Sequence, residues 1–488
     1  MYGDWMLLPI LFPILGGLAV TQIHTLHVRR VVVSLLLVAE LALVLIAGRD
    51  DAHPHVIFEL AGGLRLVLSA DPLGRMFAVL VCLIWFCVAF FAYEYMNHEG
   101  HRERFFGFFL MTLGALIGVC LAGNLATLYM FYEMMTLFSV PLVLHIGTKK
   151  AFAAAWRYLA FSVAGAGLGL LGLFMLQNFW TTDLFTAGGT LDPLLAAQNR
   201  ELLLAVFLVM ALGFGCKAGM FPLHAWLPTA HPVAPAPASA VLSGLITKMG
   251  VFALIRVAYY QFGWSFLSGS WAQRAVLVLS LITVFLGSTL ALREDTLKKR
   301  LAYSTVSQVS YVVFGLMLLN PTALEGALFQ TVFHAIAKNA LFMATGAIIY
   351  KTHLTQVSQL RGVGTVYPGT MWCFALSALS LVGIPPTGGF WSKWLLAQGA
   401  LEAGLGALSW WGIAVLMLSA LLTAGYLLPI VTNAFFPGHD FRREDVAKQQ
   451  DTPLMRLTLY PVAAGVVVLG LFPGLIRPAV DGVIGALF

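Results

Sequence analysis

Apolar runs recur along the whole chain, and each run is long enough, at about 17–25 residues, to cross a membrane as one helix. Polar or Gly- and Pro-rich breaks separate the runs. Hydrophobic residues make up 60% of the 488 residues and charged residues only 10%, whereas a soluble domain has about 25% charged residues. The chain is therefore predicted to be an all-α polytopic membrane protein, and a coiled coil or a disordered chain is excluded.

The runs predict about fourteen membrane spans and no separate soluble domain. The spans are expected near residues 5–22, 31–48, 73–95, 105–122, 124–146, 153–177, 201–222, 236–258, 272–292, 301–319, 325–350, 371–398, 408–436 and 456–474. The longest polar links, at 49–72, 178–200 and 437–455, are too short to fold alone. The first link is predicted to form a β-hairpin, with strands at 56–60 and 64–68.

The distribution of Lys and Arg predicts the orientation. If the N-terminus faces outside, the inner loops hold Arg29, Arg30, Arg102, Arg104, Lys149, Lys150, Arg293, Lys298, Lys299, Arg300, Lys351, Arg361, Arg442, Arg443, Lys448 and Arg456. The outer loops then hold only Arg49, Arg65, Arg75, Arg200, Arg274 and Arg477. Because cytoplasmic loops carry the excess of basic residues, both termini are expected outside, in the inner membrane of a bacterial or archaeal cell. The first apolar run lacks a basic region and a cleavage site, so we expect it to be retained.

Six Lys and Arg residues that belong to no loop remain inside predicted spans, and two acidic residues lie well inside apolar stretches, where a mid-bilayer charge costs on the order of 2.5–3.5 kcal/mol and marks an ion path or a buried pair. They are Arg157, Lys217, Lys248, Arg256, Lys338, Lys393, Glu40 and Glu133. The two arginines lie within reach of span ends and are expected to snorkel or anchor there. For Glu40 the sequence suggests no partner, and we expect it to face away from lipid and to be protonated.

Two spans are interrupted by Gly and Pro, and each carries a lysine. The first contains KAGMFPLHAWLP at 217–228, and the second contains GIPPTGGFWSK at 383–393. Proline has no N–H to continue the helix, and irregular backbone at membrane depth is tolerated only around cavities or buried sites. The two breaks are five spans apart and therefore run in opposite directions, which is typical of inverted-repeat transporters. Alternatively, Lys217 and Lys393 each snorkel or pair structurally, but their matched positions favour a functional role.

Glu133 lies near the middle of its span. It could be neutral and hydrogen-bonded to Tyr129 or Thr136, which share its helix face. Alternatively, it forms an ion pair with a lysine on a neighbouring span, and Lys217 is the candidate that we favour. Lys248 follows a Pro-rich run near the middle of the eighth span and is expected to relay ions between the two halves.

His334 and Lys338 are one helical turn apart on the eleventh span, so both project from one face. A lone His on an apolar face is usually satisfied locally, but beside a second titratable group it indicates a proton wire. The start of the tenth span is rich in hydroxyl and amide groups, a pattern typical of water-lined helices and equally of small polar packing residues. These residues are Tyr303, Ser304, Thr305, Ser307, Gln308, Ser310 and Tyr311.

These motifs resemble the proton-conducting antiporter-like membrane subunits of respiratory complex I, of Mrp-type Na+/H+ antiporters and of energy-converting hydrogenases. The resemblance covers essentially the whole chain. It is carried by Glu133, KAGMFPLHAWLP at 217–228, APAPAS at 234–239, HAIAK at 334–338 and GIPPTGGFWSK at 383–393.

The resemblance implies 14 transmembrane helices with two inverted five-helix repeats, whose broken helices are numbers 7 and 12. It implies helices 1–3 at 1–104, the repeats at 105–260 and 261–436, and helix 14 at 437–488. It also implies that Glu133 is the acidic partner of Lys217, that Lys248, His334 and Lys338 form the central axis, and that Lys393 ends the path. One complex I branch has Glu in place of Lys393 and the largest member has a long lateral helix, so a D-type Mrp subunit or a hydrogenase subunit fits better.

The predicted function is therefore that of an ion-translocating subunit that moves protons, or exchanges them for Na+, within a multi-subunit membrane complex. We expect no cofactor, no metal site and no redox centre of its own, because no nucleotide fingerprint or ligand cluster appears. The expected partners are other membrane subunits, the transported ions and the lipid bilayer, not nucleic acid. The alternatives are a complex I-type quinone oxidoreductase subunit specifically, a free-standing solute transporter, or a structural scaffold. Aromatic residues crowd both helix breaks, which disfavours a solute pocket.

Overall fold

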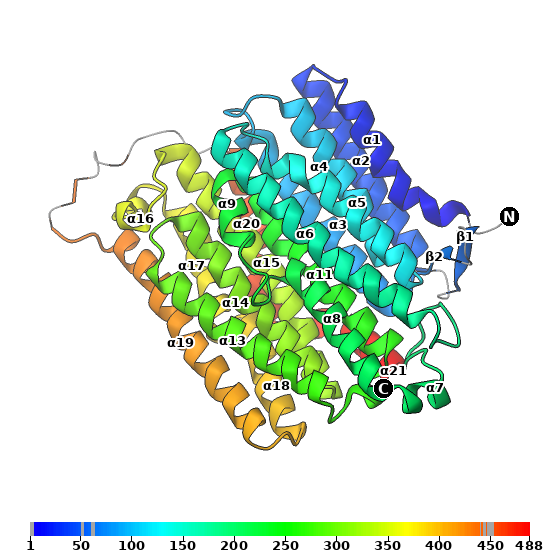
Figure 1. Ribbon diagram of the computed structural model, residues 1–488. Helices are drawn as coiled ribbons and strands as arrows, with labels where there is room; N and C mark the ends of the chain where they lie inside the picture. The colour runs from blue at the N-terminus through cyan, green and yellow to red at the C-terminus, as the bar shows by residue number, and fades with distance from the viewer. Residues whose placement is uncertain (1–3, 50–52, 60–63, 440, 443–445, 447–452) are drawn as a thin grey trace.

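The computed structural model describes residues 4–49, 53–59, 64–439, 441–442, 446 and 453–488. Within them the chain is a bundle of tilted helices with one small hairpin (Figure 1). Eleven of these helices are long and apolar enough to cross a membrane, and two shorter apolar helices span Trp5–Val20 and Pro368–Val382. The predicted class of helical multi-pass membrane protein is confirmed at this level.

The chain before residue 100 forms η1 (Asp4–Leu7), α1 (Leu8–Val20), α2 (Leu26–Ala47), β1 (His55–Glu59), β2 (Arg65–Leu68) and α3 (Pro72–Tyr95). It continues through α4 (Arg102–Cys120), α5 (Leu125–Val143), α6 (Lys149–Leu176), α7 (Pro193–Gln198), α8 (Arg200–Ala218), α9 (Leu227–Val233), α10 (Ala236–Val241), η3 (Leu242–Ile246), α11 (Thr247–Ile255) and η4 (Arg256–Gln261). The remainder forms α12 (Trp264–Leu267), α13 (Trp271–Arg293), α14 (Leu297–Met317), α15 (Pro321–Thr352), η5 (Val357–Gln359), α16 (Val363–Val366), α17 (Pro368–Val382), α18 (Gly388–Glu402), α19 (Ala407–Phe435), α20 (Pro453–Leu471), η7 (Pro473–Leu475) and α21 (Arg477–Leu487).

The predicted hairpin is confirmed. Strands β1 and β2 pair antiparallel, with Glu59 opposite Arg65 and His55 opposite Leu68. The predicted turn at residues 61–63 and the last residue of the first predicted strand, Leu60, lie outside the described residues. In Figure 1 the hairpin lies at the same end of the bundle as the start of α1, α7 and the end of α21. The start of α1 and the end of α21 are therefore on the same side of the bundle.

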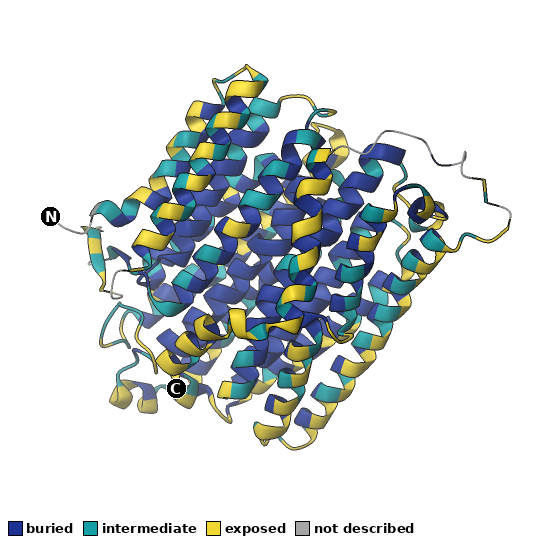
Figure 2. Ribbon diagram, turned by 180° about the vertical axis from the view of Figure 1, so that it is seen from behind, coloured by how far each residue is buried: buried dark blue, intermediate teal, exposed yellow. Residues whose placement is uncertain are grey.

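The bundle encloses two segments more completely than the others. Every residue in the most apolar stretch of Ala236–Gln261 is buried, and 89% of the corresponding stretch of α15 is buried, whereas only 28% and 33% are buried in α2 and α19. Figure 2 shows the same contrast, with a buried interior and outer helices whose outward faces are exposed. Lys248, Arg256, His334 and Lys338 all lie on the two enclosed segments, so the charges sit where lipid cannot reach them.

Two features differ from the sequence-based expectation. The enclosed segment Ala236–Gln261 contains two π-helical turns, η3 and η4, where the helix widens and carbonyls leave the regular pattern. In addition, an eleven-residue helix, α21, follows the last predicted span and packs against α3 and α15 through Val480, Val483 and Leu487. Its apolar residues are spaced by three and four positions, which was readable from the sequence.

Candidate functional site

Lys217 lies in the last turn of α8 and is 1% exposed. Its ammonium group contacts hydroxyl groups from α5 and α6, donating to Thr136 Oγ1 (2.7 Å), Tyr158 OH (3.1 Å) and Ser162 Oγ (2.9 Å). It also lies 5.7 Å and 4.6 Å from the ring centroids of Tyr132 and Tyr158, where the negative faces of the rings attract a cation. Neutral oxygens and rings therefore satisfy this ammonium.

Glu133 lies on α5 close to the same hydroxyl groups. It is half-buried, and one of its carboxylate oxygens is buried without a hydrogen-bond partner in the described residues. The carboxylate is close enough to Lys217 to interact electrostatically, but no ion pair within 4 Å joins the two among the described residues. Thr136 donates its hydroxyl to the Tyr132 carbonyl and so does not donate to Glu133. The proposed Glu133–Lys217 pair remains a prediction.

Both interrupted spans end their first helix at a glycine with a left-handed backbone. Gly219 (φ 80°) follows α8, and Gly383 (φ 92°) follows α17, a conformation that favours glycine. Each break also contains a cis peptide bond before a proline, at Pro222 and at Pro386. In the first break the indole of Trp226 donates to the carbonyl of Cys216 (2.9 Å), so that a carbonyl freed by the break is satisfied by protein.

Lys393 lies on α18 and reaches back to the end of α17. Its ammonium donates to the carbonyls of Leu381 and of Val382 (2.8 Å for the latter). These carbonyls have no helical partners and carry the negative end of the helix dipole, so they favour a cation. The two broken spans therefore hold their lysines differently, since Lys217 contacts hydroxyls and Lys393 contacts a helix end.

Lys248 and Lys338 are both almost fully buried and bind oxygens of neighbouring turns and helices. Lys248 donates to the Ser243 carbonyl (2.7 Å), which belongs to the π-helical turn η3. Lys338 donates to the Leu301 carbonyl (2.8 Å) and to Ser304 Oγ, both on α14. Neither lysine contacts a carboxylate among the described residues.

His334 lies among these lysines. It is 1% exposed, and neither ring nitrogen has a hydrogen-bond partner in the described part of the chain. It is close enough to Lys248, Lys338 and Lys393 to interact with all three electrostatically. An imidazole can accept a proton on one nitrogen and donate a proton from the other. The free nitrogens of His334 can therefore form hydrogen bonds with water or with a neighbouring ammonium group. The structure thus brings these four predicted residues together.

His231 was not among the residues predicted from the sequence, and Lys298 was predicted in the wrong environment. His231 is fully buried on α9, neither ring nitrogen has a partner in the described residues, and its neighbours include Lys248, Lys298 and Lys338. Lys298 was expected in an inner loop but is 7% exposed in α14 and donates to the Ala234 carbonyl (2.8 Å). His231 lies between KAGMFPLHAWLP at 217–228 and APAPAS at 234–239, two of the motifs that carried the resemblance, so this position was a usable signal.

Arg256 corrects a second expectation, because it neither snorkels nor anchors at the surface. It is 1% exposed and forms a two-pronged ion pair with Asp71, with Nη1–Oδ2 and Nη2–Oδ1 distances of 2.5 Å and 2.8 Å. Burial alone would raise the pKa of Asp71, but Arg256 and the Gly74 N–H outweigh it and hold that pKa below its ordinary value. The pair joins α3 to η4.

Glu40 and Arg157 occupy opposite environments. Glu40 is fully buried on α2, and both of its carboxylate oxygens lack hydrogen-bond partners in the described residues. It therefore faces away from lipid, as expected. Arg157 is exposed on α6, in agreement with an anchoring role but without testing it.

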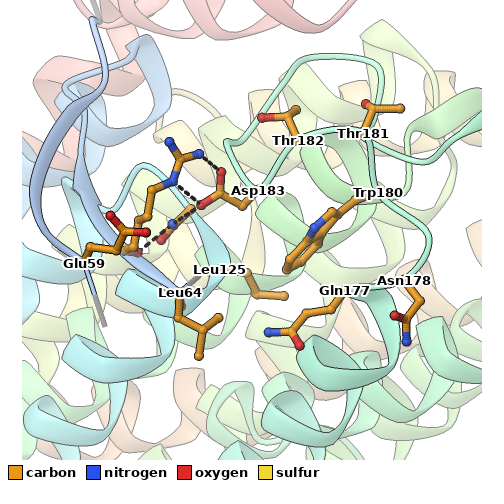
Figure 3. A pocket seen from close by; sticks show the side chains of 12 residues that line it. Glu59, Leu64, Leu125, Gln177, Asn178, Trp180, Thr181, Thr182 and Asp183 are labelled. Carbon is orange, nitrogen blue, oxygen red and sulfur yellow. Dashed lines mark hydrogen bonds and ion pairs between the residues drawn. The ribbon is translucent and has the colours of Figure 1, made fainter. Parts of the chain in front are cut away.

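A polar pocket of about 730 Å³ opens near the hairpin, above the N-terminus of α5. Figure 3 shows Glu59 and Leu64 on one side and Gln177, Asn178 and Trp180 on the other, with Asp183 between them. Asp183 accepts hydrogen bonds from Arg65 Nε (3.2 Å) and Asn124 Nδ2 (3.1 Å). Elsewhere, no three His, Cys, Asp or Glu side chains within the described ranges come together as a metal site would require.

Comparison with family models shows two matches. Residues 122–423 match the model described as NADH:quinone oxidoreductase/Mrp antiporter, transmembrane, and residues 62–106 match the complex I chain 5 N-terminus. The N-type subunit of the NADH-quinone oxidoreductase of Desulforudis audaxviator is 34% identical over 84% of this chain and 82% of its own length. The D-type subunit of the Na+/H+ antiporter of Alkalihalophilus pseudofirmus is 29% identical over 96% of this chain and 94% of its own length.

Solved structures share the same fold. A chain of the Mrp complex from a Dietzia species superposes with a TM-score of 0.85 at 23% identity, covering 100% of this chain and 98% of that one. A chain of an archaeal membrane-bound sulfane sulfur reductase superposes with a TM-score of 0.84 at 22% identity, covering 99% and 97%. At these identities the similarity establishes the fold.

Proposed function

This chain belongs to the NADH:quinone oxidoreductase/Mrp antiporter family of membrane subunits, as its motifs predicted, and we propose that it is the ion-translocating subunit of a multi-subunit membrane complex. The transported ion is the proton, with Na+ as the candidate exchanged ion. The named relatives support this assignment, because they are subunits of a quinone oxidoreductase and of a Na+/H+ antiporter. The Na+/H+ antiporter relative is the one that favours exchange for Na+.

One observation carries the proposal. Lys217, Lys248, Lys338 and Lys393 are held inside an apolar bundle by neutral oxygens, and His334 lies near three of them with both nitrogens free in the described residues. Keeping several like charges in an apolar interior is costly, and such groups in membrane proteins mark ion pathways. A lysine without a contacting carboxylate can release its proton, because no fixed negative charge holds it.

The roles follow the order of the groups. Glu133 accepts the ion and modulates the proton affinity of Lys217. Lys217 is the entry group of the first broken span. Lys248, His334 and Lys338 form the central axis, and Lys393 is the terminal group. Formation of a Glu133–Lys217 ion pair would raise the proton affinity of Lys217, and its opening would lower it. The position of the Glu133 charge would thus control when Lys217 releases its proton.

The proposed architecture has fourteen crossings, with both termini outside, in the cell membrane of a bacterium or archaeon. Residues 1–104 form the first three helices, and 437–488 contain the last. Residues 105–260 and 261–436 form two inverted repeats, each with one broken helix. The matched left-handed glycines at Gly219 and Gly383 support this division, because each ends a half-helix close to one of the two lysines of the broken spans, Lys217 and Lys393. The partners are other membrane subunits that deliver the driving energy.

The test is proton and Na+ flux into vesicles that carry the whole complex. Substituting Lys217→Ala, Glu133→Ala or Lys393→Ala should lower the initial proton flux per assembled complex by about tenfold or more, because each removes a transfer group. Lys150→Ala is the matched control, since Lys150 is an exposed lysine at the start of α6. Wild-type flux in all three variants would rule out the proposed path.

A further inference from the structure

A groove of about 600 Å³ opens on the outside of the bundle, between α3, α15 and the C-terminal helix α21. Its walls are aliphatic and include Met76 and Leu83 on α3, Val332 on α15 and Gly482 on α21. Met76 and Val332 are buried, whereas Leu83 is 50% exposed, so the groove has a deep wall and an open side. Among the described residues that line it, Arg75 is the only charged one.

The groove extends about halfway across the membrane from the hairpin end of the bundle. On α3 its lining runs from Pro72, the first residue of the helix, to Leu83, which is about 16 Å at the rise of an α-helix. On α15, which begins at Pro321, the lining residue Val332 lies equally far from the start of its helix. The hydrocarbon core of a bilayer is about 30 Å thick, so the length of the groove matches one leaflet.

A positive charge stands at the hairpin end of the groove. Arg75 is half-buried, its Nη1 donates to the Gly48 carbonyl (2.8 Å), and the described residues bring no carboxylate within ion-pair distance of it. The other cation nearby is Arg477, at the start of α21, and its charge is shared by Glu325 (3.5 Å) and Asp481 (3.8 Å). Arg75 therefore has N–H groups and a charge available for an anion such as a phosphate.

Helix α21 marks the level at which lipid head groups lie. It is short and amphipathic, its apolar residues are buried against the bundle, and it lies at the hairpin end (Figure 1). Helices of this kind lie in the membrane interface. A Cβ at Gly482 would lie 4.0 Å from the Cβ of Pro72, so α21 crosses α3 at the level of its first turn. Arg75 belongs to that level, because it is the fourth residue of α3.

A phospholipid matches these features better than a helix of another subunit does. A helix that crosses the membrane needs a contact face about 30 Å long, whereas this groove ends after about half that distance. Such a helix also places no negative charge beside Arg75 unless it carries an acidic residue there. A phospholipid has a phosphate at the head-group level and an acyl chain that spans one leaflet. Arg75 and the aliphatic walls complement these two parts in the same order along the membrane normal.

We propose that the groove between α3, α15 and α21 binds one phospholipid of the bilayer, with an acyl chain along α3 and the phosphate on Arg75. This inference goes beyond the proposed ion translocation and does not rest on it. The acyl chain fills the hollow between α3 and α21 and contacts the aliphatic walls on both sides. The lipid thereby joins the C-terminal helix to the first three helices of the chain, through contacts that the protein does not make by itself.

The test places the whole complex in vesicles that contain phosphatidylethanolamine with a photoreactive diazirine near the end of one acyl chain. After illumination, peptides that contain Leu83 and Val332 should carry the lipid label. Gly482→Phe should lower the label per assembled complex by about tenfold or more, because its ring fills the space that the acyl chain needs. Gly485→Phe is the matched control, since Gly485 also lies on α21, outside the groove and with open space around it. The control should keep the wild-type labelling.

A second pair of variants tests the phosphate contact and decides the result if Gly482→Phe does not assemble. Arg75→Gln should lower the labelling several-fold, because it removes the charge, whereas Arg75→Lys should keep most of it. The lipid site is overturned if Gly482→Phe and Gly485→Phe are labelled equally, or if Arg75→Gln is labelled like the wild type. It is also overturned if the wild-type peptides with Leu83 and Val332 carry no label, as when a helix of another subunit covers the groove. Because the measurement is of bound lipid and not of ion flux, its failure leaves the proposed function untouched.

Discussion

Individual buried charges are stabilised in this protein by different groups. Hydroxyls surround Lys217, the freed carbonyls of a helix end hold Lys393, and a carbonyl in a π-helical turn holds Lys248. Only Arg256 has a full ionic partner among these residues. The lysines are therefore free to exchange protons, whereas the Arg256 charge is fixed by Asp71 and has a structural role.

The Arg256–Asp71 pair gives a prediction at the residue scale. Asp71→Asn should destabilise the protein by about 3–5 kcal/mol, because it leaves the buried guanidinium without its counter-charge. The measurement is thermal unfolding of the purified protein in detergent. Asp183→Asn is the control, since Asp183 pairs with Arg65, which is 37% exposed, and the loss there should be at most about 1 kcal/mol. Equal losses in the two variants would show that burial does not set the strength of the pair.

The two interrupted spans show how a local sequence positions a charge. At each break a glycine ends a helix and a proline follows within three residues, and in the second break two further glycines, Gly388 and Gly389, begin the next helix. In the second break α17 and α18 approach so closely that a Cβ at Gly389 would lie 1.8 Å from the Ser380 carbonyl oxygen. Lys393 is one turn further along α18, so this contact sets its distance from the end of α17.

At the element scale we expect Gly389→Ala to destabilise the protein by about 1–3 kcal/mol, because backbone must move to admit the methyl group. The shift of Lys393 away from its carbonyls should also lower proton flux. Gly167→Ala is the control, since Gly167 lies in α6 with open space around it, and alanine favours a helix there by about 0.5–1 kcal/mol. The measurements are thermal unfolding and proton flux of both variants. A Gly389→Ala variant with wild-type stability and flux would contradict the packing argument.

The whole molecule has two distinct ends. The hairpin, α7 and the polar pocket gather at one end, together with the start of α1 and the end of α21 (Figure 1). Among the described cysteines four are buried and Cys87 is half-buried, so the native protein has little thiol to react with a charged reagent. This allows the sidedness of single added cysteines to be measured.

We expect a membrane-impermeant thiol reagent added to intact cells to label Asn178→Cys and not Lys150→Cys. Both positions are exposed. Lys150 lies at the start of α6, and Asn178 lies just after its end. Disrupted cells, in which both positions should react, provide the control. Labelling of Lys150→Cys alone in intact cells would reverse the proposed orientation, and labelling of both would contradict the odd number of crossings between them.

The long apolar runs, the hairpin and the two breaks were predictable because each depends on residues close together in the chain. Membrane thickness sets the length of a span, and glycine and proline act locally on the backbone. Three buried lysines, Lys217, Lys248 and Lys338, were also predictable, because a charge within an apolar run is visible in the sequence, whereas the buried Lys298 and Lys351 were expected in loops. Arg256 was misjudged because its position near a span end does not reveal a partner 185 residues away.

Sequence alone therefore determined the membrane class, the family and several of the buried charges, such as Lys217, Lys248 and Lys338, since chain length, hydropathy and motifs are local or compositional properties. Tertiary structure alone decided what each charge touches. Thr136 and Lys217 are 81 residues apart, and Ser288 and Ser419 are 131 residues apart. Such contacts depend on which faces of distant helices meet. The faces of membrane helices are nearly all apolar, so their sequences do not show which ones pack together and which few polar atoms come into contact.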